Sequence, residues 1–281
     1  MSLFQIVVLA VIQGAAELLP VSSSAHVIVA EKLMGLDPSA PEMTFLLVML
    51  HTGTMFAAIL YFWPRWKQMS VSFLKGVLIA TAFTGVVGLG LKKLIEKVVM
   101  ARLMNESYTE IEHLFKSIPL IALALMCAGI LIWVTGIRTK EEGARKNMTA
   151  RDAGMIGVVQ GLCLPFRGFS RSGATISTAM LSGISRGLAE DFSFALAVVL
   201  TPPVIVLERH RLLKSVGGWN APIPEGLSSL LMPGILGMLF SFGTGLFALK
   251  WLSVWLERGK WKYFGIYCML ASMLMVLTYS F

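Results

Sequence analysis

Six apolar stretches along the chain approach the length of a membrane-crossing helix, which needs about 20 apolar residues. Charged connectors such as residues 138–152 separate them, and a charged amphipathic segment, residues 99–116, is expected on a membrane surface. The pattern predicts an all-α integral membrane protein with about six transmembrane helices and no soluble domain. The six stretches are residues 44–63, 76–91, 118–136, 192–207, 229–249 and 264–279.

Two further apolar segments, residues 1–36 and 153–184, are each interrupted by a polar cluster near the middle. They contain VIQGAAELLPVSSSAHVIVAEKLMG and VVQGLCLPFRGFSRSGATISTAMLSG. Both run through an apolar pair, Gln-Gly, Leu-Pro, a serine-rich turn, a short apolar helix and a glycine. Arms of about 12 residues are too short to cross a bilayer, so each segment is expected to form a re-entrant helical hairpin.

The order of these segments predicts an inverted repeat within a single membrane domain, residues 1–281. The first half, 1–152, starts with one hairpin, and the second half, 153–281, starts with the other. Three predicted spans separate the two hairpins, and an odd number reverses the direction of insertion. The hairpin tips are therefore expected to meet near the middle of the membrane.

The charge of the chain supports this arrangement and excludes a nucleic-acid-binding function. Only 14% of the residues are charged, against about 25% in soluble domains, so the net charge of +8 is not that of a nucleic-acid-binding protein. Most of the positive excess falls on the predicted face that carries residues 138–152. The positive-inside rule makes that face cytoplasmic, so the first hairpin opens to the outside.

The first hairpin tip carries polar residues that are costly inside a bilayer and usually functional there. Gln13 and Glu17 are four residues apart and share a helical face. Their oxygen atoms could hold a hard divalent cation such as Mg²⁺ or Ca²⁺, with Mn²⁺ as a third candidate. The structural alternative is that Glu17 caps a helix or pairs with Arg171.

The serines of this tip, Ser22, Ser23 and Ser24, follow Pro20 and are expected to start a helix, where free N–H groups favour anions. Taken alone, they could equally be ordinary capping residues. His26 lies within one helical turn of Ser23 and could serve as its base, with Glu17 as a third member of the set. The alternative is a core histidine with one hydrogen bond.

The second tip surrounds an arginine with small and hydroxyl-bearing residues. The planar fork of Arg171 suits phosphate, and small neighbours let the backbone approach it. An acid, several hydroxyls, an imidazole and an arginine together suit phosphoryl transfer. His51, in the first predicted span, could reach this site or bond to a neighbouring helix. The candidate substrate-binding residues are Ser22, Ser24, Arg167, Ser170, Ser172, Gly173 and Thr175.

The segments QGAAELLPVSSSAH and GFSRSGATIS resemble the two signature segments of the bacterial undecaprenyl-diphosphate phosphatase family of the bacitracin-resistance type. The resemblance extends over the whole chain in length, motif order and span layout. It implies a multi-pass enzyme of the bacterial inner membrane, with a metal-dependent site facing the periplasm. Such an enzyme hydrolyses undecaprenyl diphosphate to undecaprenyl phosphate and inorganic phosphate. This recycles the lipid carrier for peptidoglycan synthesis, supports cell wall biogenesis and cell shape, and gives bacitracin resistance.

The resemblance also implies roles for single residues. Gln13 and Glu17 match the two acidic-motif positions, Ser23 the nucleophile or hydroxyl ligand, His26 the essential histidine and Arg171 the arginine of Ser-Arg-Ser-Gly. The sequence departs from the family pattern in three places. Alanine stands at Ala16 where Thr is common and at Ala25 where Gly is common, and PFRG, which contains Arg167, replaces Pro-Gly.

Two other function classes remain open from the sequence: a transporter or flippase of polyprenyl phosphate, and a non-catalytic lipid-binding paralogue. A homodimer is also open. The other membrane lipid phosphatases have a Ser-Arg-x5-His motif. They are excluded because the sixth residue after Arg171, where that motif has its histidine, is Ser177.

Overall fold

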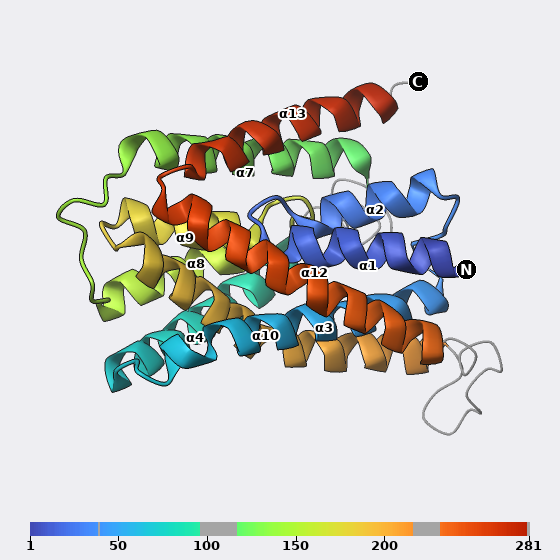
Figure 1. The fold of residues 1–281 in the computed structure, drawn as a ribbon, viewed down its shortest axis with the longest axis horizontal. Helices are drawn as coiled ribbons and strands as arrows, with labels where there is room; N and C mark the ends of the chain where they lie inside the picture. The colour runs from blue at the N-terminus through green and yellow to red at the C-terminus, as the bar shows by residue number, and fades with distance from the viewer. Residues whose placement is uncertain (39, 96–116, 216–230, 280–281) are drawn as a thin grey trace.

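The computed structural model of the chain describes residues 1–38, 40–95, 117–215 and 231–279, apart from the side chains of residues 41, 42 and 207–215. The described part is all-helical (Figure 1). The predicted surface segment, residues 99–116, lies outside it. The helices are α1 Leu3–Leu18, α2 Ser23–Leu33, α3 Pro41–Trp66, α4 Val71–Leu94, α7 Ile118–Arg138, α8 Ala150–Cys163, α9 Arg171–Leu181, α10 Arg186–Ser215, α12 Leu231–Glu257 and α13 Trp261–Tyr279.

Six of the described helices are long and apolar enough to cross a membrane, which confirms the predicted spans. These spans lie in α3, α4, α7, α10, α12 and α13. The largest difference at the start of a span is in α10, which begins at Arg186 rather than residue 192. Its first turns hold two buried acids, Glu190 and Asp191, which lie 3.3 and 3.1 Å from the guanidinium of Arg65 on α3. A charged stretch can therefore belong to the span because its countercharge comes from another helix.

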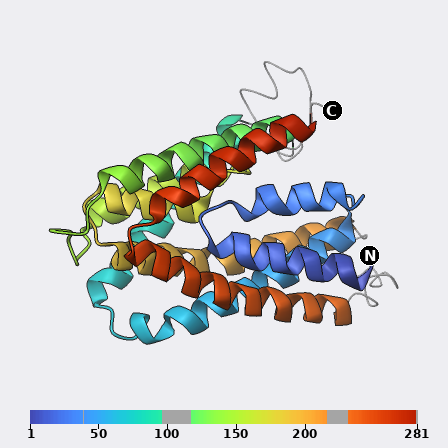
Figure 2. The same ribbon diagram turned by 45° about the horizontal axis from the view of Figure 1, so that its top comes forward.

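The two interrupted segments form short antiparallel helical hairpins, α1–α2 and α8–α9. Figure 1 shows α1–α2 entering the bundle from the right and α8–α9 from the left, with their turns close together in the interior. In the turned view of Figure 2, α1 and α2 again lie side by side, with α13 above them and α12 below. How the hairpins lie in a bilayer, and the division into inverted halves, stay predictions.

The second tip depends on a glycine. Gly168 has a φ of +98°, and a Cβ on it would lie 2.3 Å from the carbonyl oxygen of Ile121 on α7. Only glycine permits both the backbone conformation and this close approach. The Gly168 N–H in turn donates a 3.3 Å hydrogen bond to Ser24 Oγ of the first tip, so the two tips are joined directly.

Small residues let the long helices pack closely, as is usual between membrane helices. On α7 and α13, a Cβ on Gly129 or Gly265 would lie 2.9 or 2.6 Å from the carbonyl oxygen of the other. On α8, a Cβ on Gly157 would lie 2.3 Å from the carbonyl oxygen of Ala80 on α4. The outward faces are apolar; on α4, for example, Leu78 is 68% exposed.

The start of α8 is fixed by a carboxylate outside the six spans. Asp152 accepts hydrogen bonds of 2.9 and 3.0 Å from the guanidinium of Arg145, and of 2.7 Å from the Thr149 hydroxyl. The bonds from Arg145 are the main reason that the pKa of Asp152 is lowered from 3.8 to about 2. This pair ties the α7–α8 connection to the second hairpin, because Arg145 also donates to the carbonyl of Ser182.

Candidate active site

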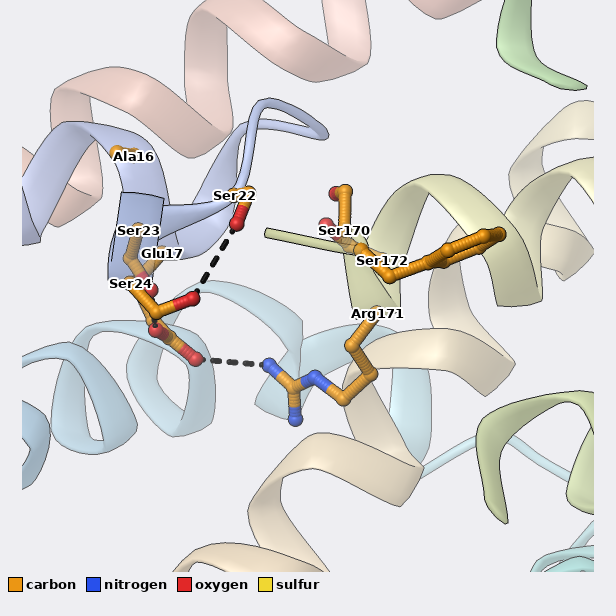
Figure 3. A pocket seen from close by; sticks show the side chains of 9 residues that line it. Ala16, Glu17, Ser22, Ser23, Ser24, Ser170, Arg171 and Ser172 are labelled. Carbon is orange, nitrogen blue, oxygen red and sulfur yellow. Dashed lines mark hydrogen bonds and ion pairs between the residues drawn. The ribbon is translucent and has the colours of Figure 1, made fainter. Parts of the chain in front are cut away.

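A cavity of about 90 Å³ lies between the two hairpin tips (Figure 3). Its wall combines the end of α1, the start of α2 and the start of α9. Seven of its nine lining residues are candidates named from the sequence, and Phe169 is one that sequence reasoning missed. The lining residues are Ala16, Glu17, Ser22, Ser23, Ser24, Phe169, Ser170, Arg171 and Ser172.

Glu17 is the centre of the hydrogen bonds in this cavity. Its Oε1 accepts a 2.9 Å bond from Arg171 Nη2, and its Oε2 accepts bonds from Ser23 Oγ at 2.5 Å and Gln13 Nε2 at 3.2 Å. Figure 3 shows Arg171 extending from α9 toward this carboxylate across the gap between the tips. The arginine–glutamate pair considered as a structural alternative is therefore present, and it lies within the candidate site.

Two helix N-termini face the same cavity. α2 starts at Ser23, and α9 starts at Arg171 with Ser170 as its N-cap, whose Oγ accepts a 3.2 Å bond from the Gly173 N–H. The N–H groups of a first helical turn lack carbonyl partners within the helix, and the helix dipole adds partial positive charge there. Together with the guanidinium of Arg171, this makes the cavity suitable for a phosphate group.

His26 lies elsewhere than sequence reasoning expected. It does not line the cavity, and its ring nitrogens are 2.8 Å from the carbonyl oxygen of Ser22 and 2.8 Å from the hydroxyl of Tyr267 on α13. The structure thus does not bring His26 to Ser23, whose hydroxyl donates to Glu17 instead. The role of His26 as a base stays a prediction. Tyr267, 241 residues away in the chain, carried no signal in the sequence.

The remaining candidates of the second tip divide into two groups. Ser170 and Ser172 line the cavity with Arg171, whereas Gly173 and Thr175 lie inside the protein. The Thr175 hydroxyl forms a 2.6 Å hydrogen bond with Ser193 on α10 and so attaches α9 to that helix. Arg167 is partly exposed and does not line the cavity.

The donor set suits a hard cation. The Glu17 carboxylate, the Gln13 amide and the Ser23 hydroxyl meet within hydrogen-bond distance, and all can offer oxygen atoms, which Mg²⁺ and Ca²⁺ prefer. No group of three His, Cys, Asp or Glu in the described part of the chain could hold a metal ion. A cation at Glu17 and Gln13 would therefore need further oxygen atoms, from water or from its substrate, to complete its coordination.

His51 is the residue that sequence reasoning left undecided. Its Nε2 lies 3.7 Å from Glu17 Oε2, so it reaches the edge of the site from α3. Its Nδ1 is 2.8 Å from the carbonyl oxygen of Leu47, so it also bonds within its own helix. The structure thus brings His51 to the edge of the site, and the contact of its other ring nitrogen is within α3 rather than with a neighbouring helix.

Comparison with known proteins agrees with these motifs. Residues 6–274 match the family model described as bacitracin resistance protein BacA. The chain is 59% identical over 276 residues to Undecaprenyl-diphosphatase 2 of Acinetobacter baylyi, covering 96% of this chain and 95% of that protein. It is 31% identical to Undecaprenyl-diphosphatase 2 of Burkholderia orbicola (96% and 95% covered) and to Undecaprenyl-diphosphatase 1 of Burkholderia pseudomallei (97% and 95%). The match over nearly the whole length, with both hairpin motifs inside it, means that this chain belongs to the BacA family.

Proposed function

We propose that this protein hydrolyses undecaprenyl diphosphate to undecaprenyl phosphate and inorganic phosphate, recycling the lipid carrier for peptidoglycan synthesis. The observation that carries the proposal is the gathering of Glu17, Ser23 and Arg171 in one cavity between two helix N-termini. The names of the relatives point to the same substrate. The protein would act in the bacterial inner membrane, with the cavity reached from the periplasmic side, as the positive-inside count favours.

In this proposal Arg171 and the two helix starts bind the diphosphate. The Ser23 oxygen bonds to the terminal phosphorus, the bond from that phosphorus to the bridging oxygen breaks, and undecaprenyl phosphate leaves. The hydroxyl proton passes to Glu17, whose Oε2 already accepts it at 2.5 Å. Water then hydrolyses the phosphoserine, inorganic phosphate leaves, and Ser23 regains its proton. Direct attack by water gives the same products, and trapping a phosphoserine in a rapid quench separates the two routes.

A divalent cation, Mg²⁺, Ca²⁺ or Mn²⁺, would be held by Glu17 and Gln13 and would neutralise charge on the diphosphate oxygens. The chain's own part is to orient these two side chains. Because Gln13 donates to Glu17 at 3.2 Å, the amide would have to turn its oxygen toward a cation. A Gln13→Glu variant would offer a carboxylate there and should change the metal preference more than the fold.

The test is phosphate release by the purified protein from undecaprenyl or farnesyl diphosphate, with and without chelator. We expect release from the parent protein, its loss in excess chelator and its return with Mg²⁺, Ca²⁺ or Mn²⁺. Glu17→Gln should be inactive. Glu142→Gln, at an exposed position in the connection between α7 and α8, should release phosphate at the rate of the parent protein. Full activity in chelator would contradict the metal, and no release at all would favour a transporter or lipid-binding protein.

A further inference from the structure

The turn that opens α2 has an unusual backbone. Ser22 has φ +67° and ψ 96°, and it is the sole non-glycine residue with positive φ in the described part of the chain. Residues other than glycine keep such a conformation only when their surroundings hold them in it, and such residues concentrate at functional sites. Ser22 lines the cavity and immediately precedes Ser23.

His26 provides that hold. A carbonyl oxygen can only accept, so the 2.8 Å contact between His26 Nδ1 and the Ser22 oxygen means that Nδ1 carries the hydrogen. The backbone N–H of His26 reaches the same oxygen at 3.4 Å. A peptide unit is planar and trans, so fixing the Ser22 carbonyl also fixes the direction of the Ser23 N–H. That N–H belongs to the first residue of α2.

Tyr267 holds His26 in turn. With the hydrogen on Nδ1, a neutral ring has an acceptor at Nε2, and the Tyr267 hydroxyl lies 2.8 Å from it. The two rings are also stacked, with centroids 5.7 Å apart and planes inclined by 11°. Both ring nitrogens of His26 are thus engaged, one by α13 and one by the turn, and neither bonds to Ser23.

We propose that His26 and Tyr267 are positioning residues that hold the Ser22–Ser23 peptide so that the start of α2 receives the terminal phosphate. Tyr267 fixes the tautomer and plane of the imidazole, and the imidazole fixes the turn. His26 therefore acts through Ser22 and transfers no proton to or from the substrate. The inference rests on the proposed phosphatase activity, and on the cavity as its phosphate site.

The test uses side chains that imitate one ring nitrogen at a time. Asparagine places an amide N–H near the position of Nδ1 and can donate to the Ser22 carbonyl, whereas glutamine reaches the position of Nε2 and can contact only Tyr267. Neither amide can act as a base or nucleophile. We expect His26→Asn to keep turnover within about tenfold of the parent, the cost of one imperfect hydrogen bond. We expect His26→Gln and His26→Ala to lose about 10²-fold or more in kcat/KM.

A second test of the proposal uses the variant Tyr267→Phe, with Tyr263→Phe as its matched control. The two tyrosines lie one turn apart on α13 and are equally exposed, at 47% each, but only Tyr267 bonds to His26. We expect Tyr267→Phe to raise KM several-fold with the same pH profile of kcat, by loss of about one hydrogen bond. Tyr263→Phe should behave as the parent. Turnover is taken per folded molecule, from size-exclusion and melting profiles.

The proposal would be overturned if His26→Asn were as inactive as His26→Gln while both remain folded. It would also be overturned if Tyr267→Phe matched Tyr263→Phe, or if a phosphohistidine were trapped in a rapid quench. These outcomes would return His26 to the role of base or nucleophile. Failure of the proposed function looks different, because the parent protein would then release no phosphate in the same assay.

Discussion

Replacing Arg171 with lysine separates a catalytic arginine from a structural one. In the structure Arg171 uses one N–H, on Nη2, to bond Glu17 at 2.9 Å. A guanidinium has five N–H donors in a plane, so the others remain for a phosphate in the cavity that it lines. An ammonium has three donors on one atom. If it keeps the bond to Glu17, it cannot also offer a planar pair to the phosphate.

The two interpretations predict effects of different size. If Arg171 stabilises charge that develops on the phosphate, its loss should slow turnover about 10²–10³-fold, or about 2.7–4 kcal/mol. Arg171→Ala would confuse this effect with misfolding, because removing one partner of a buried ion pair costs about 3–5 kcal/mol of stability. The Arg171 and Glu17 side chains are 22% and 17% exposed, so the lower end of that range applies. Arg171→Lys keeps the charge opposite Glu17 and should lose far less stability.

The assay is phosphate release per correctly folded molecule, measured beside size-exclusion and melting profiles in detergent. Arg151→Lys, at an exposed position on α8, is the control and should match the parent in both measurements. We expect folded Arg171→Lys with turnover reduced by about two to three orders of magnitude. Folded Arg171→Lys with turnover within about threefold of the parent would refute the reasoning, since a salt bridge alone tolerates lysine.

The remaining predictions concern topology, pH and packing. On a background without native cysteines, Leu33→Cys should be labelled by an impermeant maleimide in intact cells and Glu142→Cys only after permeabilisation; the reverse pattern would overturn the orientation. Asp152→Asn should lower the free energy of unfolding at pH 7 by about 1 kcal/mol after allowance for solvent screening, measured as a lower melting temperature. Because the folded pKa of Asp152 is depressed to about 2, this contribution is present above pH 3.8 and is lost as the pH falls toward 2. A gap between variant and parent that stays constant from pH 7 to pH 3 would contradict the carboxylate's role. Gly157→Ala should destabilise by about 1–3 kcal/mol, because its Cβ would meet α4 backbone at 2.3 Å. Gly85→Ala, where nothing lies within 4 Å, should melt like the parent, and equal losses in the two would contradict the packing argument.

The sequence alone was sufficient for the helices and for most of the cavity. A membrane span needs only a long apolar run, and an interrupted hairpin needs only short apolar arms on either side of a polar turn. The local pattern of apolar and polar residues therefore predicts both. The spacing of Gln13 and Glu17 likewise fixes them on one helical face. The meeting of the two tips followed from the odd number of spans between the hairpins, which reverses the direction of insertion of the second.

Tertiary structure decided what depends on partners distant in the chain. The first turns of α10 lie in the span because Arg65, 125 residues earlier, faces Glu190. His26 bonds to Tyr267, and Ser23 donates its hydroxyl hydrogen to Glu17. The spacing of three residues between Ser23 and His26 had indicated that these two would be partners. Sequence spacing tells which residues share a face of one helix. Which atoms meet across helices depends on how close the backbones approach, and here that is determined by glycine contacts and by a strained turn at Ser22.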